Sequence, residues 1–347
     1  MKNTSLIFVL LLLTGCLHNP QTIQEPFEGI QGFSNVFEGF EELCPYFAYK
    51  GINWVEITSE YYPEAASCTS DEEFLAVISD MLAELQDPAI NLFEVDNQWQ
   101  IVDIIYPFSI TIEPNYDMDV LLDNYLPQYG WAGWEDGYAE GVGWCDPEIL
   151  PYLFFDSIPD PIQQSAFAAL DAFIAECIQL EISSIIVDIR MSSSDSGGTA
   201  FFGRFAEKSY PGAIYRSRSG PEYDQYTDSR PVIYPSGPKQ YTGTVYLLVG
   251  ENCRQRSEIV TASLLNFPNV VLVGDTTGGS VSLFSKMKPV IGNWWCSVIT
   301  TTLLTYDEHW IEGNGIYPDI AVEATEADFA AGLDPVLDYA IEMLGSY

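Results

Sequence analysis

Three short apolar runs, separated by helical patterns, constrain the fold of this chain more than any other feature of its sequence. The runs are SSIIVDIR, GTVYLLVG and NVVLVGD, at 183–190, 243–250 and 269–275. Amphipathic helical patterns precede the first run at 161–180 and join the second to the third at 257–267. Strands and helices that alternate at this spacing are typical of βα units, whose strands form a largely parallel sheet. We therefore expect an α/β fold of the mixed α+β kind.

The rest of the chain divides into a helical beginning and a longer core. Residues 28–95 have mostly helical apolar spacing. Residues 100–160 alternate in polarity and are rich in Gly, Pro and aromatic residues, which indicates strands and long loops. Asp334 followed by Pro335 predicts the start of a C-terminal helix. We expect an N-terminal helical domain at 28–95 and a core domain at 96–347.

The first residues form a targeting pattern. Lys2 precedes the apolar run LIFVLLLL, which is too short to span a bilayer as a mature helix. The segment LTGC resembles a bacterial lipobox, in which the cysteine is lipidated and becomes the new N-terminus. We therefore expect 1–15 to be a signal peptide, Cys16 to be a lipid anchor and 16–27 to be a tether, in an exported lipoprotein of the periplasm, outer membrane or cell surface. A plain secretory signal is the alternative.

The chain is strongly acidic. Its fifty Asp and Glu residues against thirteen Lys and Arg residues give a net charge of −37. Such a surface repels nucleic acid and anionic lipid headgroups, so neither is expected as a specific partner. Eleven of the thirteen basic residues lie within 190–288. They form either ordinary salt bridges or a basic pocket that attracts anions such as peptide carboxylates.

The cysteines and histidines give no sign of a metal site. Six cysteines follow Cys16, and the sequence does not select a disulfide pairing among them. Cys177 lies in a helical pattern and is predicted to be a buried thiol. No CxxC or HExxH spacing occurs, so no zinc site and no cofactor are expected.

Four segments in one order resemble the C-terminal processing (tail-specific) serine protease family. The similarity is to its lipoprotein members and to the branch related to tricorn core proteases. SSIIVDIR resembles a family strand that ends Asp-Leu-Arg before a glycine-rich loop, and residues 245–280 resemble the nucleophile segment with its Gly-Asp/Glu-x-Thr-x-Gly loop. IEGNGIYPDI, at 311–320, resembles the ending Glu-Gly-x-Gly-Ile-x-Pro-Asp, and FEELCPYFAYKGINW, at 40–54, resembles the N-terminal helical region. The resemblance implies a crotonase/Clp-protease-like ββα core with an N-terminal helical domain.

The resemblance also implies where the catalytic residues of a serine peptidase would lie. In the family the nucleophile is the Ser of Ser-Ala-x-Glu, and a register set by Glu258 puts Gln255 at that position. An amide cannot act as the nucleophile. One branch uses a Lys just after the glycine of the Thr-x-Gly loop, where this chain has Gly279. The other branch uses the His of Asp-Gly-His, where this chain has Asp87 followed by Ala89.

The oxyanion loop and the histidines depart from the family as well. Serines occupy 192–194, where the family has glycines, and Gly197 and Gly198 follow a few residues later. The chain has one histidine in the tether and a second, His309, to which the resemblance gives no catalytic role. Because the residues of a catalytic triad act as a unit, the joint loss of nucleophile and bases predicts a non-catalytic homologue.

The leading hypothesis is therefore a pseudoprotease that binds peptides or protein C-termini. Gln255 can hydrogen-bond a peptide backbone, and Arg254 or Arg256 can pair with a C-terminal carboxylate. Gly197 and Gly198 are expected to line the same site. Salt bridges to neighbouring glutamates are the alternative for the two arginines.

Two other functions stay open from the sequence. An active serine endopeptidase could use Ser257 as a relocated nucleophile, with Lys286 or Lys288 as the base. The alternative for Ser257 is a helix N-cap. A structural or assembly lipoprotein would instead have its groove filled by side chains such as Phe201, Phe202 or Phe284.

Overall fold

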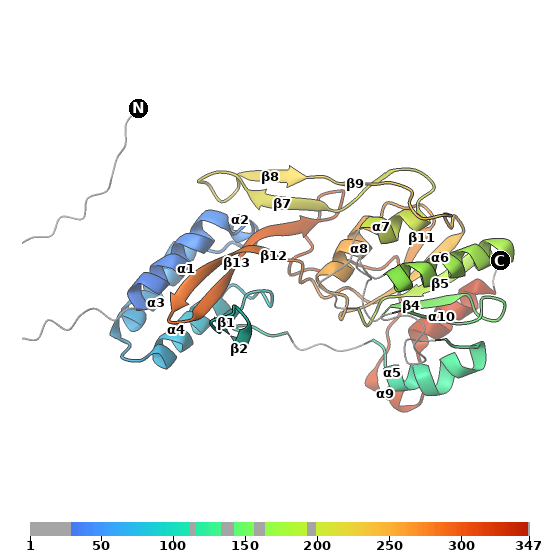
Figure 1. Ribbon diagram of the computed structural model, residues 1–347, viewed down its shortest axis with the longest axis horizontal. Helices are drawn as coiled ribbons and strands as arrows, with labels where there is room; N and C mark the ends of the chain where they lie inside the picture. Colours follow the sequence, from blue (N-terminus) through green and yellow to red (C-terminus); the bar gives the residue numbers. More distant parts are fainter. Residues whose placement is uncertain (1–28, 111–114, 133–141, 156–163, 193–198, 346–347) are drawn as a thin grey trace, which may run out of the picture.

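The computed structural model of the protein is an elongated molecule with two lobes (Figure 1). The structure describes residues 29–110, 115–132, 142–155, 164–192 and 199–345. The predicted signal peptide and tether, Cys16, Gly197 and Gly198 lie outside these residues. One lobe consists of the first helices packed on an antiparallel sheet, and the other is built around a mainly parallel sheet.

The second lobe is built on a six-stranded sheet with the order β14-β11-β10-β5-β4-β3. Its neighbouring strands are parallel except for the pair β3 and β4. The three apolar runs of the sequence form β5, β10 and β11, which are neighbours in the sheet and parallel, so the predicted parallel arrangement is confirmed. The strands are β3 (Val142–Trp144), β4 (Tyr152–Phe155), β5 (Ser184–Asp188), β10 (Thr244–Val249), β11 (Val270–Gly274) and β14 (Ile320–Ala321).

Helices cover both faces of this sheet, as Figure 1 shows. Ile185 and Leu247 point to one face and share a hydrophobic cluster with α6, α7 and α8. Ile186 and Leu248 point to the other face and share a cluster with α10. Strands buried on both faces are apolar at successive positions, which explains the continuous runs and confirms the mixed α/β fold. The helices are α6 (Gln164–Gln179), α7 (Thr199–Phe202), α8 (Arg256–Leu264) and α10 (Pro335–Leu344).

The first lobe packs four helices against a second sheet, with the order β2-β1-β13-β7-β8 and β12 paired to β13. The helices are α1 (Gly29–Leu43), α2 (Phe47–Lys50), α3 (Trp54–Ser67) and α4 (Asp71–Ala83). The strands are β1 (Leu92–Val95), β2 (Ile101–Ile105), β7 (Ile214–Arg218), β8 (Tyr226–Ser229), β12 (Leu283–Ile291) and β13 (Trp294–Leu304).

Strand β13 joins the two lobes. Its Val298 lies in the hydrophobic cluster of the helical lobe, with Phe40 and Ile78, whereas its Leu303 lies in the cluster of the parallel sheet. The helices of the first lobe therefore share their core with a segment more than two hundred residues later in the sequence. The division of the chain into 28–95 and 96–347 stays a prediction.

Short helical turns occupy part of the region predicted to contain only strands and loops. The Asp117 carboxylate accepts the N–H of Val120 and so starts a helical segment. Leu121 and Leu126 then bury their side chains, which fixes the turns to the core. The remaining short elements are α5 (Met118–Val120), the π-helical turn η1 (Leu121–Tyr125), the 3-10 turns η2 (Leu126–Tyr129) and η4 (Gly203–Phe205), β6 (Tyr210–Pro211), β9 (Val232–Ile233) and α9 (Glu326–Ala330).

Arg190 fixes the C-terminal helix to the parallel sheet. Its Nη2 lies 2.7 Å from Oδ2 of Asp188 and 2.9 Å from Oδ2 of Asp334, and all three side chains are buried. Asp334 also accepts the N–H of Leu337, so it is the N-cap of α10 as predicted. Asp188 and Arg190, the two charged residues of the strand motif SSIIVDIR, therefore have a structural role.

Among the described residues, no helix is long and apolar enough to cross a membrane.

Candidate functional site

Gln255 lies in a sharp turn between β10 and α8. Its backbone has φ 50° and ψ −111°, and its N–H donates to the Ser280 carbonyl at 2.8 Å. A positive φ is strained for any residue with a β-carbon, and a strained strand-to-helix turn is how α/β-hydrolases present their nucleophile. The turn at Gln255 thus has the backbone geometry of a nucleophile elbow, although its side chain is an amide.

Ser257 does not lie on the surface of this turn. Helix α8 begins at Arg256, so Ser257 is inside the first turn, and the expectation that it is the N-cap is wrong. Its side chain is fully buried, and its Oγ donates to the Ser192 carbonyl. The N-cap position belongs to Gln255, because the strained turn starts the helix earlier than the sequence pattern indicated.

The two lysines considered as bases lie on β12. Lys286 is exposed and pairs with Val298 of β13. The stem of Lys288 packs against Gly39 of α1, since a β-carbon at Gly39 would lie 3.0 Å from its Cγ. The structure thus places Lys288 against the helical lobe, whereas Ser257 is in the core of the parallel-sheet lobe.

Glu258, which set the sequence register, is a buried anchor for the loop after β11. Its carboxylate accepts three hydrogen bonds: from the Thr277 hydroxyl at 2.5 Å, the Gly279 N–H at 2.7 Å and the Ser280 N–H at 2.8 Å. Burial raises the pKa of Glu258 to about 7, against the lowering effect of these donors. The carboxylate therefore holds the loop that contains one of the two base positions.

Gly279, the position of the lysine base in one branch, has no room for a side chain. Its φ is 64°, and a β-carbon there would lie 2.8 Å from the Gly315 nitrogen and 3.1 Å from the Asn314 nitrogen. The Gly313 N–H also donates to the Gly279 carbonyl at 2.8 Å. Both the positive φ and the close backbone exclude a lysine in this conformation.

Ala89, the position of the histidine base in the other branch, is buried beside the carboxylate of Asp87. Its N–H donates to Oδ1 of Asp87 at 2.9 Å. Asp87 is itself buried, and its charge acts on that of Glu312. An acid beside the base is the usual third member of a catalytic triad, but a methyl group leaves nothing for it to orient.

Glu312 was not among the site residues predicted from the sequence. This residue is buried, and its Oε1 lies 3.3 Å from Nζ of Lys50. Its Oε2 accepts the Ser282 hydroxyl at 2.8 Å and the Val281 N–H at 3.1 Å. Burial and the nearby Asp87 carboxylate raise the pKa of Glu312 above its ordinary value. The sequence signal that could have pointed to it is its place as the first residue of the Glu-Gly-x-Gly motif in the segment 311–320.

One short segment connects the nucleophile position to this carboxylate. The Ser280 carbonyl accepts the N–H of Gln255, and the next two residues, Val281 and Ser282, donate to Glu312. A cavity of about 490 Å³ opens beside Glu312 and is lined by Lys50 and residues of 84–86 and 313–314. The structure thus brings Gln255, Gly279, Ala89 and Glu312 into one region where the lobes meet.

The arginines flank the turn. Nε of Arg254 donates to the Glu251 carbonyl at 3.1 Å, and no carboxylate of the described residues lies within ion-pair distance of its guanidinium. Burial lowers the pKa of Arg254 below its ordinary value. Arg256 is half-buried, and its charge acts on Tyr215. The alternative of pairing with neighbouring glutamates is met only at longer range: the charges of Glu258 and Glu251 act on Arg254, although its hydrogen bond is to the main chain.

Other residues considered from the sequence lie elsewhere. His309 is exposed, with its Nδ1 3.0 Å from Asp307. Phe201 and Phe202 are buried in the core of the parallel-sheet lobe, and the side chain of Phe284 lies outside the described residues.

No group of three or more His, Cys, Asp or Glu residues in the described part of the chain is placed to hold a metal ion. The six cysteines of the described part, Cys177 among them, are buried free thiols.

Comparison with known families decides the assignment. A model of peptidase family S41 matches residues 158–322, and a model of the tricorn protease C1 domain matches residues 31–83. Residues 158–322 belong to peptidase family S41. The S41 match contains β5, the Gln255 turn and the loop after β11. The tricorn C1 match contains most of α1 and all of α3 and α4.

Solved structures show the same fold as this S41-family protein. A putative peptidase from Parabacteroides merdae is similar with a TM-score of 0.75 and 20% identity, over 91% of this chain and 96% of that one. Mature CPAF in complex with lactacystin is similar with a TM-score of 0.61 and 11% identity, over 91% of this chain and 97% of that one. The tricorn protease is similar with a TM-score of 0.55 and 15% identity, over 91% of this chain and 36% of that larger chain. Among curated proteins, none matches the chain in sequence.

Proposed function

We propose that this S41-family protein is a lipid-anchored pseudoprotease that binds peptides or protein C-termini and does not cleave them. The observation that carries the proposal is Gln255, an amide in a strained turn with the backbone of a nucleophile elbow. The packing at Gly279 and the methyl group at Ala89 support it, because neither position can supply a base.

The binding part of the proposal rests on Arg254. Its guanidinium is half-buried, and no carboxylate of the described residues lies within ion-pair distance of it, although the charges of Glu258 and Glu251 act on it from further away. A peptide carboxylate can form a charge-assisted, two-point hydrogen bond with such a group. The side-chain amide of Gln255, next to it, offers a donor and an acceptor to a peptide backbone.

Calorimetry with short peptides tests this function. Peptides with a free C-terminal carboxylate should bind the wild-type protein, and their amidated forms should bind about tenfold more weakly or worse. Arg254→Ala should remove this preference. Arg230→Ala is the matched control, because Arg230 is exposed and paired with Glu308. Absence of binding, or equal affinities for both peptide forms, would contradict the proposal.

The alternative of an active endopeptidase needs Ser257 to reach a substrate. Ser257 is fully buried and donates to a main-chain carbonyl, which argues against it. A fluorophosphonate probe tests the point, and we expect no labelling of the wild-type protein. Labelling that disappears in Ser257→Ala would favour the alternative.

The lipid anchor is a separate part of the proposal. It rests on Cys16 at the end of the LTGC motif. In a bacterial host, the wild-type chain should be found in the membrane fraction and Cys16→Ala in the soluble fraction. If the wild-type protein and Cys16→Ala are found in the same fraction, Cys16 is not the anchor. The protein is then a plain secreted protein or an assembly factor held by other contacts.

A further inference from the structure

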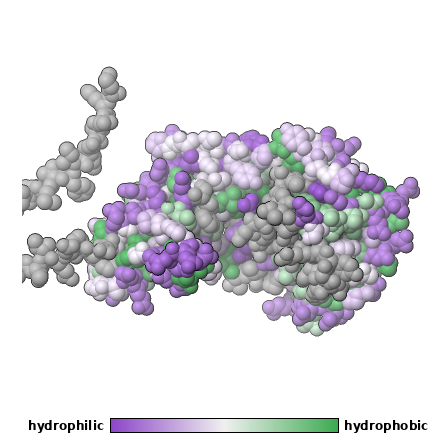
Figure 2. All heavy atoms as spheres, in the orientation of Figure 1, coloured by the Kyte–Doolittle hydropathy of each residue, from purple (hydrophilic) through white to green (hydrophobic). Residues whose placement is uncertain are grey.

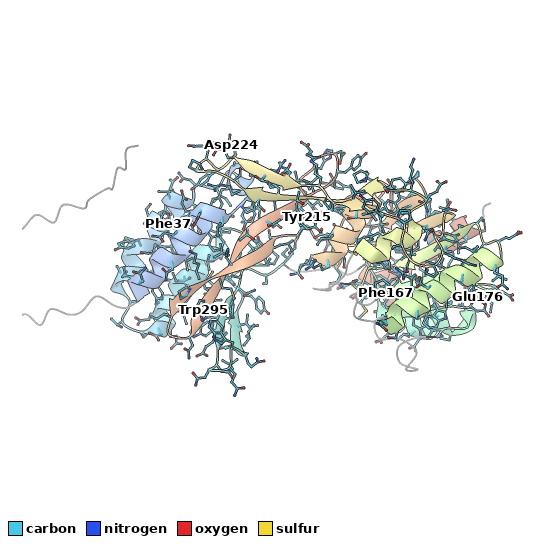
Figure 3. The ribbon with its side chains drawn as sticks, turned by 45° about the horizontal axis from the view of Figure 1, so that its top comes forward. Phe37, Phe167, Glu176, Tyr215, Asp224 and Trp295 are labelled. Carbon is cyan, nitrogen blue, oxygen red and sulfur yellow. The ribbon has the colours of Figure 1, made fainter. Side chains whose placement is uncertain are left out.

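The β1–β2 hairpin has an unusual concentration of exposed apolar side chains. Six of the seventeen large apolar side chains that are exposed in the described residues lie between Trp99 and Ile110. Ile101 and Val102 of β2 are each more than half exposed, and Trp99 packs beside Trp295 of β13 at 5.1 Å between ring centroids. Figure 3 shows the hairpin extending from the body of the molecule below Trp295. An exposed apolar patch of this kind marks an interaction site.

Strand β2 is also the edge of its sheet. The sheet order ends at β2, which pairs with β1 on one side. An edge strand turns alternate N–H and C=O groups outward, where they can pair with another strand. The Ile104 N–H is one of these, because it donates to Oδ1 of Asp103 at 2.8 Å. Asp103 thus caps an open hydrogen-bonding edge with a carboxylate, a known protection against unwanted strand pairing.

The two faces of this edge differ in chemistry. Residues paired across the sheet share a face, so Ile104 lies in a row with Phe93 and Trp295, and Asp103 in a row with Trp294. The first row is apolar. The second faces a groove of about 590 Å³ between β2 and α4, lined by the carboxylates of Asp71, Glu72, Asp80 and Asp103 together with apolar side chains.

Among the described residues, no Lys or Arg lines this groove. Hydrophilic and hydrophobic atoms lie side by side in Figure 2 where Figure 1 places β2. A second copy of the chain would bring like charges together along this edge, which is unfavourable. An anionic membrane surface would be repelled for the same reason.

We propose that the β2 edge binds an extended segment of another protein in which basic and apolar residues alternate. The segment adds a strand to β2 through main-chain hydrogen bonds, with its Lys or Arg side chains in the acidic groove and its apolar side chains beside Ile104 and Trp295. A basic side chain that pairs with Asp103 draws this carboxylate from the Ile104 N–H and so frees the donor for the incoming strand. Charge thereby selects which strands can pair with the edge.

The surface lies apart from the Gln255 turn. Figure 1 places β2 in the helical lobe and α8 in the lobe of the parallel sheet. The proposal therefore does not depend on peptide binding at Gln255, and each can fail without the other.

Calorimetry on the full chain tests the proposal. The probe is a capped peptide of about ten residues in which Lys and Val alternate. It should bind, and raising the salt concentration should weaken the binding, because the contacts are partly ionic. A peptide that alternates Glu and Val, and a peptide with the lysines and valines in two separate blocks, should not bind.

Two variants locate the site. Ile104→Pro removes the outward N–H, and proline is tolerated at an edge strand, so thermal unfolding should be little changed while binding falls about tenfold or more. Asp80→Lys should weaken binding to a similar degree. Glu60→Lys, the same charge change on an exposed residue of α3, should leave the affinity near that of the wild type.

Four results would overturn the proposal. The first is no binding of the alternating Lys–Val peptide, and the second is an equal loss of peptide affinity in Asp80→Lys and Glu60→Lys. The third is a stable dimer of the wild-type chain in sedimentation that Ile104→Pro separates into monomers. The fourth is binding to phosphatidylcholine vesicles through Trp99 without binding to the peptide. The third result would assign the edge to a second copy, and the fourth would assign it to a membrane surface.

Discussion

Lys50 and Glu312 are 262 positions apart in the sequence, and Nζ of the lysine lies 3.3 Å from Oε1 of the glutamate. Lys50 ends α2 in the helical lobe, and Glu312 follows β13. Glu312 is buried, and the Asp87 carboxylate raises its pKa whereas the nearby Lys50 charge lowers it. The pair joins the helical lobe to the segment that follows β13.

Lys50→Met should destabilise the protein strongly, because it leaves buried acidic groups without a cation. We expect a loss of about 3 kcal/mol in the free energy of unfolding, measured by urea denaturation. The double variant Lys50→Met/Glu312→Gln removes the uncompensated charge and should recover part of this loss. A double variant that is as unstable as the sum of both single variants would show that the two residues do not interact.

Gln255→Gly should stabilise the protein. Glycine adopts a positive φ without the clash of a β-carbon, so the change relieves the strain at the turn and should raise the free energy of unfolding by about 1 kcal/mol. Gln255→Ala keeps the β-carbon and is the control, with no stabilisation expected. Equal stabilities of the two variants in urea denaturation would indicate that the turn is not strained.

Gly279→Ala should be more destabilising than Gly51→Ala. Both glycines have positive φ, at 64° and 67°. A β-carbon at Gly279 would meet the Gly315 nitrogen at 2.8 Å, whereas one at Gly51 would meet nothing within 4 Å. The Gly51 variant therefore measures the backbone strain alone, about 1 kcal/mol, and the Gly279 variant should lose about 2 kcal/mol more from the clash. Similar losses in thermal or urea unfolding would mean that the loop can move to admit a side chain.

The stability of the protein should fall as the pH rises from about 5 to about 8. Burial raises the pKa of Glu258 to about 7 from its ordinary value of 4.5. The unfolded carboxyl group loses its proton above about pH 4.5, while the folded one keeps it until about pH 7. The stabilisation is therefore complete below the unfolded pKa and is lost as the pH rises through the folded pKa.

Glu258→Gln should reduce this pH dependence by about 3 kcal/mol between pH 5 and 8, because glutamine does not titrate. Urea denaturation at the two pH values measures it. At pH 5 the variant should also be less stable than the wild type, since one amide oxygen replaces a carboxyl group that accepts three hydrogen bonds. An unchanged pH dependence in the variant would assign the effect to other groups, such as Glu312.

Local patterns in the sequence were sufficient for the three central strands of the parallel sheet and for the start of the C-terminal helix. Asp334 and Pro335 predicted the start of α10 because a cap and its helix are neighbours in the chain. The apolar runs predicted β5, β10 and β11 for the same local reason. The start of α8 was placed too late, because a strained residue such as Gln255 at a helix N-cap has no signature in propensity.

The sequence by itself determined the fold class, the family resemblance and the identity of the residues at the nucleophile and base positions, since each depends on residue type and order along the chain. Only the tertiary structure showed that Gly279 has no room for a lysine, that Ser257 is buried, and that Glu312 lies between Lys50 and the loop at Ser282. It also showed that β2 is an open edge above an acidic groove. These features depend on contacts between segments up to 262 positions apart, and such contacts follow from packing that no local pattern records.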